Sequence, residues 1–150
     1  MIKRESYHTT SICELDDGTI VSCSEDRSIM IGDYTIKSAH DRKVNKVIAL
    51  PNRRIASCSD DKTIKIWKSN MIYSRSVKLL VGHSDSVTSI LYIKEKDIMI
   101  SGSLDRTIRL WNMSTYQCMK VIEEVECIDN NSLYQIDKER VIVGRDKISI

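Results

Sequence analysis

The 150-residue sequence has no phenylalanine, one proline and only five glycines. So little proline and glycine excludes collagen-like chains and flexible linkers. No run approaches the ~20 consecutive apolar residues that a membrane-spanning helix requires. The chain starts with the basic residues Lys3 and Arg4, but no apolar segment follows them. We therefore expect neither a secretory signal nor membrane contact.

Strong charge of one sign is also missing. The 23 lysines and arginines against 21 acidic residues leave a formal net charge of +2, so electrostatics disfavour nucleic acid as a partner. The five cysteines form no Cys-x-x-Cys pair, which argues against a disulfide framework and against a thiolate zinc site. There is no glycine-rich phosphate loop. We expect a cytoplasmic protein, with the nucleus as the alternative, that uses no metal and no cofactor.

Isoleucine is abundant, with 22 residues in a sequence that is 41% hydrophobic. Its branched side chain favours strands. A short motif also recurs: residues 22–31 return as 57–67 and again as 101–111, and the shared aspartates Asp26, Asp61 and Asp105 are 35 and 44 residues apart. A weaker copy over 143–150 places Asp146 a further 41 residues on. Each copy predicts two strands joined by a tight turn.

Further strand patterns flank each motif, at 44–50 and 87–93 upstream and at 77–81 and 118–122 downstream. Four strands in ~40 residues make one blade of a β-propeller. We predict an all-β fold of four-stranded antiparallel blades, three complete and a fourth partial, and consider it half of a larger ring. The expected blades cover about residues 6–38, 39–82, 83–123 and 124–150, the last completed by residues 1–5 or by another chain.

The second and third copies carry an additional pattern. Ala39-His40 and Gly82-His83 precede the motif, and Trp67 and Trp111 end it. In these residues the chain resembles the WD-repeat β-propeller family, and the resemblance covers nearly the whole sequence. It implies a scaffold of blades rather than an enzyme.

Several positions depart from the family pattern. Lys68 and Asn112 follow the two tryptophans where the family has aspartate, and Gly32 replaces the tryptophan of the first copy. Glu5 stands at the histidine position of that copy, and the fourth copy lacks both histidine and tryptophan. We interpret the first and fourth copies as degenerate repeats.

The resemblance implies a hydrogen-bonded tetrad of histidine, serine, aspartate and tryptophan in each well-kept blade. The two sets are His40, Ser57, Asp61 and Trp67, and His83, Ser101, Asp105 and Trp111. Histidine, serine and aspartate are also the residues of a hydrolytic triad, so a serine hydrolase using His83, Ser101 and Asp105 is the alternative from another class. Repetition at the blade period favours the structural role, because catalysis needs one such set in one cleft.

Other candidates have simpler explanations. Asp16-Asp17-Gly18 is a hairpin-turn signal rather than a pair of catalytic carboxylates. Lys62, Lys65 and Lys68 are favoured as a solvated strand over a phosphate site. Cys23 and Cys58 occupy the position of Gly102 and are expected to be inert small residues.

The resemblance also implies where a protein or peptide partner binds. Family contact positions flank the first buried valine of each inner strand and precede the tetrad aspartate. Carried over, they are His8, Thr10 and Glu25 in the first blade, Lys43, Asn45 and Asp60 in the second, and Ser86, Thr88 and Leu104 in the third. A second candidate is the loop with Met71, Ile72 and Tyr73, since 22 residues separate Asp61 from His83 but only 14 separate Asp26 from His40.

We therefore expect a non-catalytic scaffold or adaptor for protein–protein interaction. A substrate receptor of a ubiquitin-ligase-type complex is the alternative among binding modules. The ring could close as four blades, by pairing with a second copy, or within a longer chain. Self-association or a longer parent chain is favoured, because an open arc leaves strand edges unpaired.

Overall fold

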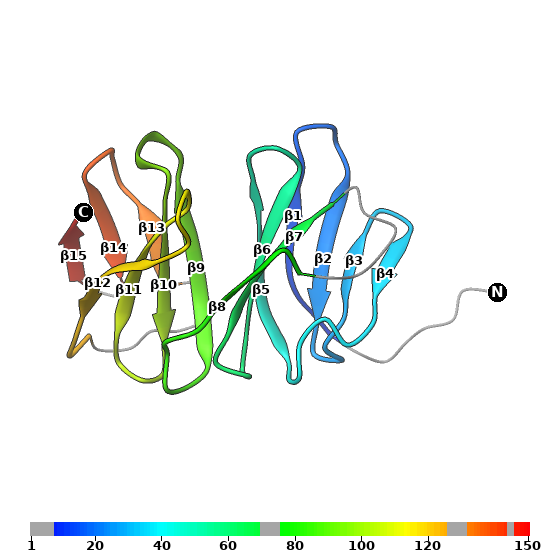
Figure 1. Ribbon diagram of the computed structural model, residues 1–150, viewed down its shortest axis with the longest axis horizontal. Coiled ribbons are helices and arrows are strands. Elements are labelled where there is room, and N and C mark those ends of the chain that lie inside the picture. Colours follow the sequence, from blue (N-terminus) through cyan, green and yellow to red (C-terminus); the bar gives the residue numbers. More distant parts are fainter. Residues whose placement is uncertain (1–7, 70–75, 126–131, 144–145) are drawn as a thin grey trace.

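The computed structural model describes residues 8–69, 76–125, 132–143 and 146–150, which form four antiparallel sheets standing side by side in chain order (Figure 1). The first sheet contains β1 (Thr9–Glu14), β2 (Ile20–Ser24), β3 (Ile29–Ile31) and β4 (Tyr34–Ile36). The second contains β5 (Val44–Leu50), β6 (Arg54–Ser59), β7 (Ile64–Lys68) and β8 (Lys78–Leu80). The third contains β9 (Val87–Ile93), β10 (Ile98–Ser103), β11 (Ile108–Asn112) and β12 (Cys118–Ile122). The fourth contains β13 (Leu133–Gln135), β14 (Arg140–Val143) and β15 (Asp146–Ser149).

Within each sheet, every strand pairs with the next one along the chain, so each sheet is a simple meander. Within the described ranges, the single helical turn is η1 (Lys94–Lys96). The all-β prediction is confirmed, with blade-like sheets of three or four strands. The first strands of neighbouring sheets lie against one another, while the first and fourth sheets lie at opposite ends of the row (Figure 1).

The same local features shape the hairpin in each of the first three sheets. A register shift interrupts the first strand near its start, as between Val44 and Lys46. The residue after each motif aspartate has a left-handed backbone, with φ of 75° at Arg27, 72° at Lys62 and 65° at Arg106. This conformation closes the tight turn between the second and third strands.

The fourth copy differs from the sequence-based alignment. Asp146 lies in β15, opposite Val143 of β14, and not in the turn as Asp61 does. The reason is length: two residues separate β14 from β15, whereas four separate β6 from β7. The aligned aspartate therefore cannot occupy a turn of the same kind, and that part of the alignment was wrong.

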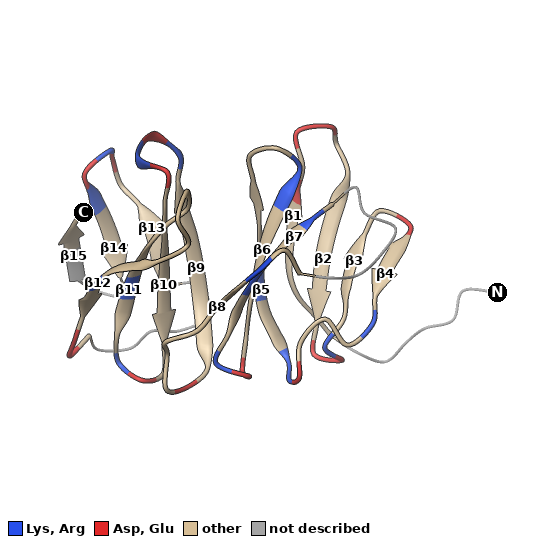
Figure 2. Cartoon of the chain, in the orientation of Figure 1, with Lys and Arg blue, Asp and Glu red and all other residues tan. Residues whose placement is uncertain are grey.

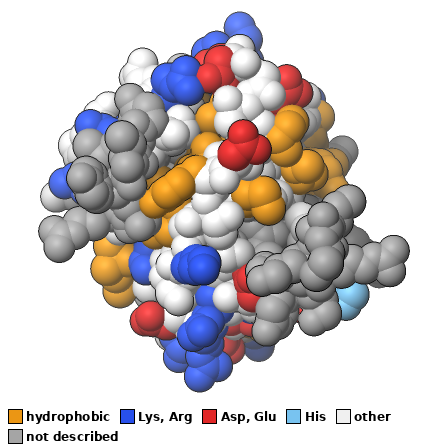
Figure 3. Space-filling view, turned by 90° about the vertical axis from the view of Figure 1, so that its right-hand side faces the viewer, with side chains coloured by type: hydrophobic (Ala, Val, Ile, Leu, Met, Phe, Trp, Pro, Cys, Tyr) orange, Lys and Arg blue, Asp and Glu red, His pale blue; other side chains and the backbone are white. Residues whose placement is uncertain are grey.

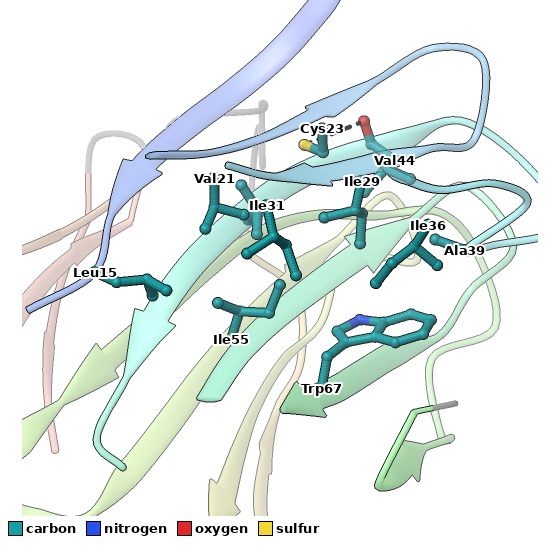
Figure 4. Packing of buried hydrophobic residues seen from close by; sticks show 11 residues of the cluster. Leu15, Val21, Cys23, Ile29, Ile31, Ile36, Ala39, Val44, Ile55 and Trp67 are labelled. Carbon is teal, nitrogen blue, oxygen red and sulfur yellow. Dashed lines mark hydrogen bonds between the residues drawn. The ribbon is translucent and has the colours of Figure 1, made fainter. Parts of the chain in front are cut away.

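The core consists of three apolar layers, one between each pair of neighbouring sheets. We call the side of a sheet that packs on the next sheet its forward face, and the side that packs on the previous sheet its rear face. In the first layer, Val21 and Ile31 on the forward face of the first sheet meet Ile55 and Trp67 on the rear face of the second (Figure 4). Burying each such side chain contributes about 1.5–3 kcal/mol.

Charged residues concentrate in the turns at both ends of the strands (Figure 2). The apolar layers therefore lie between the sheets, and the charged residues lie mostly in the turns. Over the described ranges, the chain has no helix that is both long enough and apolar enough to cross a membrane.

Candidate functional site

The second sheet brings together the four residues of the first predicted tetrad. Ser57 lies on β6 and Trp67 on β7, Asp61 lies in the turn between them, and His40 precedes β5. His40 Nδ1 is 2.8 Å from Asp61 Oδ2, and His40 Nε2 is 2.7 Å from Ser57 Oγ. Trp67 Nε1 donates to the same serine oxygen at 2.8 Å. The third sheet repeats this chain of hydrogen bonds, at the same distances, in His83, Ser101, Asp105 and Trp111.

The direction of each hydrogen bond follows from the tryptophan. An indole N–H can only donate, so Ser57 Oγ accepts a hydrogen bond from Trp67. The serine O–H then donates a hydrogen bond to His40 Nε2. His40 then carries its proton on Nδ1 and donates it to Asp61. An imidazole that accepts at Nε2 and donates at Nδ1 thus satisfies every member of the chain, as buried polar groups require.

A threonine completes each set, and sequence reasoning did not assign it a role. The hydroxyl of Thr63 donates to Asp61 Oδ1 at 2.6 Å, and its backbone N–H donates to the same oxygen at 3.0 Å. Thr107 makes the same two contacts with Asp105. A threonine or serine recurs two residues after the motif aspartate in each of the first three copies; that is the signal that could have revealed it.

These contacts alter the ionisation of the aspartates. Burial alone would raise the pKa of Asp61, but hydrogen bonds from His40 and Thr63 outweigh it and hold that pKa well below its ordinary value. Burial opposes the shift at Asp105 as well, yet bonds from Thr107 and Ser84 lower its pKa to about 2. Burial lowers the pKa of His83, and the attraction of Asp105 only partly offsets this effect. The third-sheet set is therefore stable as a carboxylate beside a neutral imidazole.

The distances match those of a hydrolytic triad, so burial has to decide what the set can do. Ser57 and Ser101 have no exposed surface, and each oxygen already accepts an indole N–H. A nucleophile must reach a substrate and an oxyanion hole, and a sealed serine between two sheets reaches neither. The geometry favours a brace that ties the turn to the sheet.

Among the described residues, the first sheet has no such brace. Asp26 accepts from the backbone N–H and hydroxyl of Ser28 at 2.9 and 2.5 Å. Gly32 occupies the tryptophan position with a φ of 55°. Glu5, at the histidine position, lies outside the described residues.

The predicted partner positions divide into two groups. The first group consists of Thr10, Asn45 and Thr88, the second residues of the inner strands. Asn45 is buried, and its amide donates to Val87 O of the next sheet at 2.9 Å and to Asp60 Oδ1 at 2.7 Å. Thr10 likewise donates to Val44 O of the next sheet, and Thr88 is buried. Thr10 and Asn45 therefore link neighbouring sheets.

The other six lie together in pairs at one end of the strands. Backbone hydrogen bonds of 3.0–3.2 Å join Glu25 to His8, Asp60 to Lys43 and Leu104 to Ser86. We call these six residues the turn face. Lys43 also forms an ion pair with Glu25 at 3.2 Å across the first two sheets. The loop candidates Met71, Ile72 and Tyr73 lie outside the described residues.

Of the three lysines, Lys65 has a structural contact. Its ammonium donates to Ala39 O at 2.8 Å and lies 5.8 Å from the ring centre of Trp67, while Lys62 and Lys68 are exposed. No group of three or more histidine, cysteine or acidic residues in the described ranges could hold a metal ion.

Comparison with known proteins shows which family these repeats resemble. The family described as WD domain, G-beta repeat matches residues 34–68 and 74–112, the stretches that hold β7 and β11 with the two tryptophans. The chain is 34% identical to the nuclear distribution protein nudF of Aspergillus niger, over 88% of this chain and 32% of that protein. It is 31% identical to the probable coatomer subunit beta' of Schizosaccharomyces pombe, over 87% of this chain and 16% of that protein.

A third relative is the DDB1- and CUL4-associated factor 10 of Xenopus laevis, 33% identical over 52% of this chain and 17% of that protein. The chain thus spans a third or less of the length of these curated relatives. Each matched segment contains one complete hydrogen-bonded set of histidine, serine, aspartate and tryptophan, and the chain belongs to the WD-repeat family.

Proposed function

We propose that this protein is a non-catalytic scaffold that binds protein or peptide partners on its turn face. The observation that carries the proposal is the pairing of exposed or half-exposed residues on three neighbouring turns, of which the second and third are braced. Because the tetrads hold the second and third turns in place, these side chains keep fixed positions and lose little freedom on binding.

The chemistry of the turn face suggests the kind of partner. It is mixed in charge, with Glu25 and Asp60 beside Lys43, and it presents Leu104 with 55% of its surface exposed. A segment with an apolar side chain flanked by polar groups would fit this pattern. The six residues include no tryptophan, tyrosine or phenylalanine, so they do not supply the aromatic walls of a methyl-lysine site.

The relatives support an assembly role. A coatomer subunit and a DDB1- and CUL4-associated factor are, by name, components of protein assemblies. The second of these supports the alternative proposal, a substrate receptor in a ubiquitin-ligase-type complex. Direct binding of purified DDB1 to this chain would favour the alternative. A cytoplasmic location is part of our proposal, and cell fractionation tests it.

Two variants with a matched control test the turn face. Leu104→Glu and Lys43→Glu change the turn face, whereas Leu79→Glu changes an equally exposed leucine, also at 55%, on the outer strand β8. Partners captured with the wild-type chain and then purified should bind the first two variants at least about tenfold more weakly, because each introduces an unmatched charge. The control should bind them normally.

Equal binding of all three variants would contradict the proposed site. The hydrolase alternative has its own test, which is labelling with a serine-reactive phosphonate. Modification of Ser57 or Ser101 in the folded protein would support catalysis and contradict a scaffold that uses these serines only as braces.

A further inference from the structure

The first sheet exposes apolar side chains on its rear face. Ile12 on β1 is 65% exposed, and Ile20 on β2 and Met30 on β3 are each 48% exposed. Figure 3 views the end of the row that the first sheet occupies, where hydrophobic side chains lie among polar ones. No described sheet precedes this one, so nothing described covers its rear face.

The strand register shows that the positions equivalent to Ile12 are buried in the second and third sheets. Ile12 lies opposite Ser22, just as Val47 lies opposite Ser57 and Ile90 opposite Ser101. Val47 is 1% exposed and Ile90 is fully buried, because the preceding sheet covers each of them. Ile12 therefore has an interior position of the repeat, and no described sheet covers it.

The fourth sheet has the converse face uncovered. Tyr134 lies opposite Ile142, as Leu91 lies opposite Ile100 on the forward face of the third sheet. Tyr134 is 59% exposed and Ile136, two residues on, is 41% exposed. Leu91 and its neighbours instead belong to the apolar layer beneath the fourth sheet. The fourth sheet thus presents a forward face with no described sheet on it.

These two faces are the two halves of one junction. Every apolar layer between the described sheets joins a forward face to a rear face, and the row ends with one uncovered example of each. They lie at opposite ends of the row (Figure 1), so they do not meet within one molecule of this structure. A second copy of the chain carries both complementary faces.

Charge complementarity supports the second copy as the occupant. Across the junction of the second and third sheets, Arg54 Nη1 donates to Tyr116 Oη at 2.6 Å. In the fourth sheet, Arg140 occupies the position equivalent to Arg54. Ile136 N donates to Arg140 O across the hairpin, and Leu50 pairs with Arg54 in the same way. The turn of the first sheet that corresponds to that of Tyr116 contains the exposed Asp33. Arg140 already forms an ion pair with Asp137 Oδ2 at 2.6 Å in its own turn, so in this junction its guanidinium would lie between that carboxylate and the carboxylate of Asp33 in the other copy.

We propose that two copies associate so that the forward face of each fourth sheet packs on the rear face of the other copy's first sheet. Two such junctions give a closed ring of eight sheets, which is within the 4–8 blades typical of propellers. The junctions use sheet faces and not the turn face, so this inference and the proposed function can fail separately.

Sedimentation velocity of the 150-residue chain over a wide concentration range tests the proposal. The expected mass at high concentration is twice 17.2 kDa. Ile20→Lys on the rear face and Tyr134→Lys on the forward face should each weaken dimerisation by at least about tenfold, because each puts an unpaired charge into an apolar junction. Leu79→Lys changes a similarly exposed residue of the second sheet, outside both faces of the proposed junction, and should dimerise normally. Circular dichroism shows that each variant is folded.

Mixing the two variants identifies which faces meet. In the mixture, the intact forward face of Ile20→Lys can pack on the intact rear face of Tyr134→Lys, while the second junction carries both lysines. The mixture should therefore form a heterodimer through one wild-type junction, which neither variant has alone. Asp33→Arg should weaken dimerisation and Arg140→Asp should restore it in the same chain. A monomer at every concentration, as expected if a different protein covers these faces, would overturn the proposal. Open polymers, or dimers indifferent to both face variants, would also overturn it.

Discussion

The second and third sheets differ from the first in how their turns are held. Asp61 accepts hydrogen bonds from His40, Asp41 and Thr63, which come from two separate segments of the chain. Among the described residues, the carboxylate of Asp26 accepts hydrogen bonds only from its own hairpin, from Ser28 and Ser24. The same turn sequence, with the same left-handed residue after the aspartate, therefore forms with and without the brace.

This difference separates what makes the hairpin from what anchors it. The turn needs the aspartate, its serine or threonine two residues on, and a residue that accepts positive φ. Histidine and tryptophan add a link between the turn, the second strand and the third strand. The first sheet shows that the fold accepts their loss at one end of the row, where its rear face has no described neighbour.

The largest effect is expected from removing a tryptophan from a braced sheet. Trp111→Gly makes the third sheet resemble the first, where Gly32 has this position. It should lower the free energy of unfolding by about 3–5 kcal/mol, because it leaves a cavity and removes the indole donor to Ser101. Urea unfolding measures the change. A loss below about 1 kcal/mol would mean that the brace contributes nothing beyond the hairpin.

The next largest effect is expected from replacing the motif aspartates of the braced sheets. Asp105→Ala and Asp61→Ala should each cost about 1–3 kcal/mol, since each leaves buried donors without an acceptor. Asp26→Ala is the matched variant in the unbraced sheet and should cost less than either. Thermal melting of the three proteins gives the ranking, and equal losses at all three positions would contradict the difference drawn between the sheets.

Acid should weaken the third sheet in two stages. The folded-state pKa of His83 lies below its ordinary value of 6.5, so the unfolded chain binds a proton first and stability falls as pH drops below that value. The pKa of Asp105 is about 2 instead of 3.8, so its contribution is present above pH 3.8 and is lost as pH falls towards 2. Melting temperatures from pH 7 to 2 should therefore fall throughout.

His83→Gln provides the control for the first stage, because glutamine does not titrate. The fall between pH 6.5 and about 4 should be shallower in this variant than in the wild type. An identical slope would mean that the imidazole is not held neutral by its buried site.

The repeat made the braces predictable, because equal spacing put the same four residue types at equal places in two copies. Thr63 and Thr107 were not assigned, since a threonine before an isoleucine is also typical of the start of a strand. Asn45 was expected on a partner-binding face and is buried, because neighbouring inner strands meet closely enough for its amide to bond Val87 O. A sequence pattern gives the strand and its polarity but not the distance between two sheets. Asp146 was misaligned because turn length does not follow from the aspartate period.

The smallest expected effect concerns the residue before each tetrad histidine, which is Ala39 in the second sheet and Gly82 in the third. A Cβ on Gly82 would lie 2.6 Å from Nη1 of Arg109, whereas Ala39 coexists with Lys65, whose slender ammonium bonds Ala39 O. Gly82→Ala should cost about 1 kcal/mol, because the guanidinium has to move.

Adding Arg109→Lys to Gly82→Ala should remove most of that cost, since the double variant would reproduce in the third sheet the alanine–lysine pair that Ala39 and Lys65 form in the second. A double-mutant cycle on urea unfolding isolates this coupling. If Gly82→Ala is equally costly with arginine and with lysine at position 109, the glycine is needed for its backbone and not for the space it leaves. The correspondence between the two sheets would then end at the histidine and not include the residue before it.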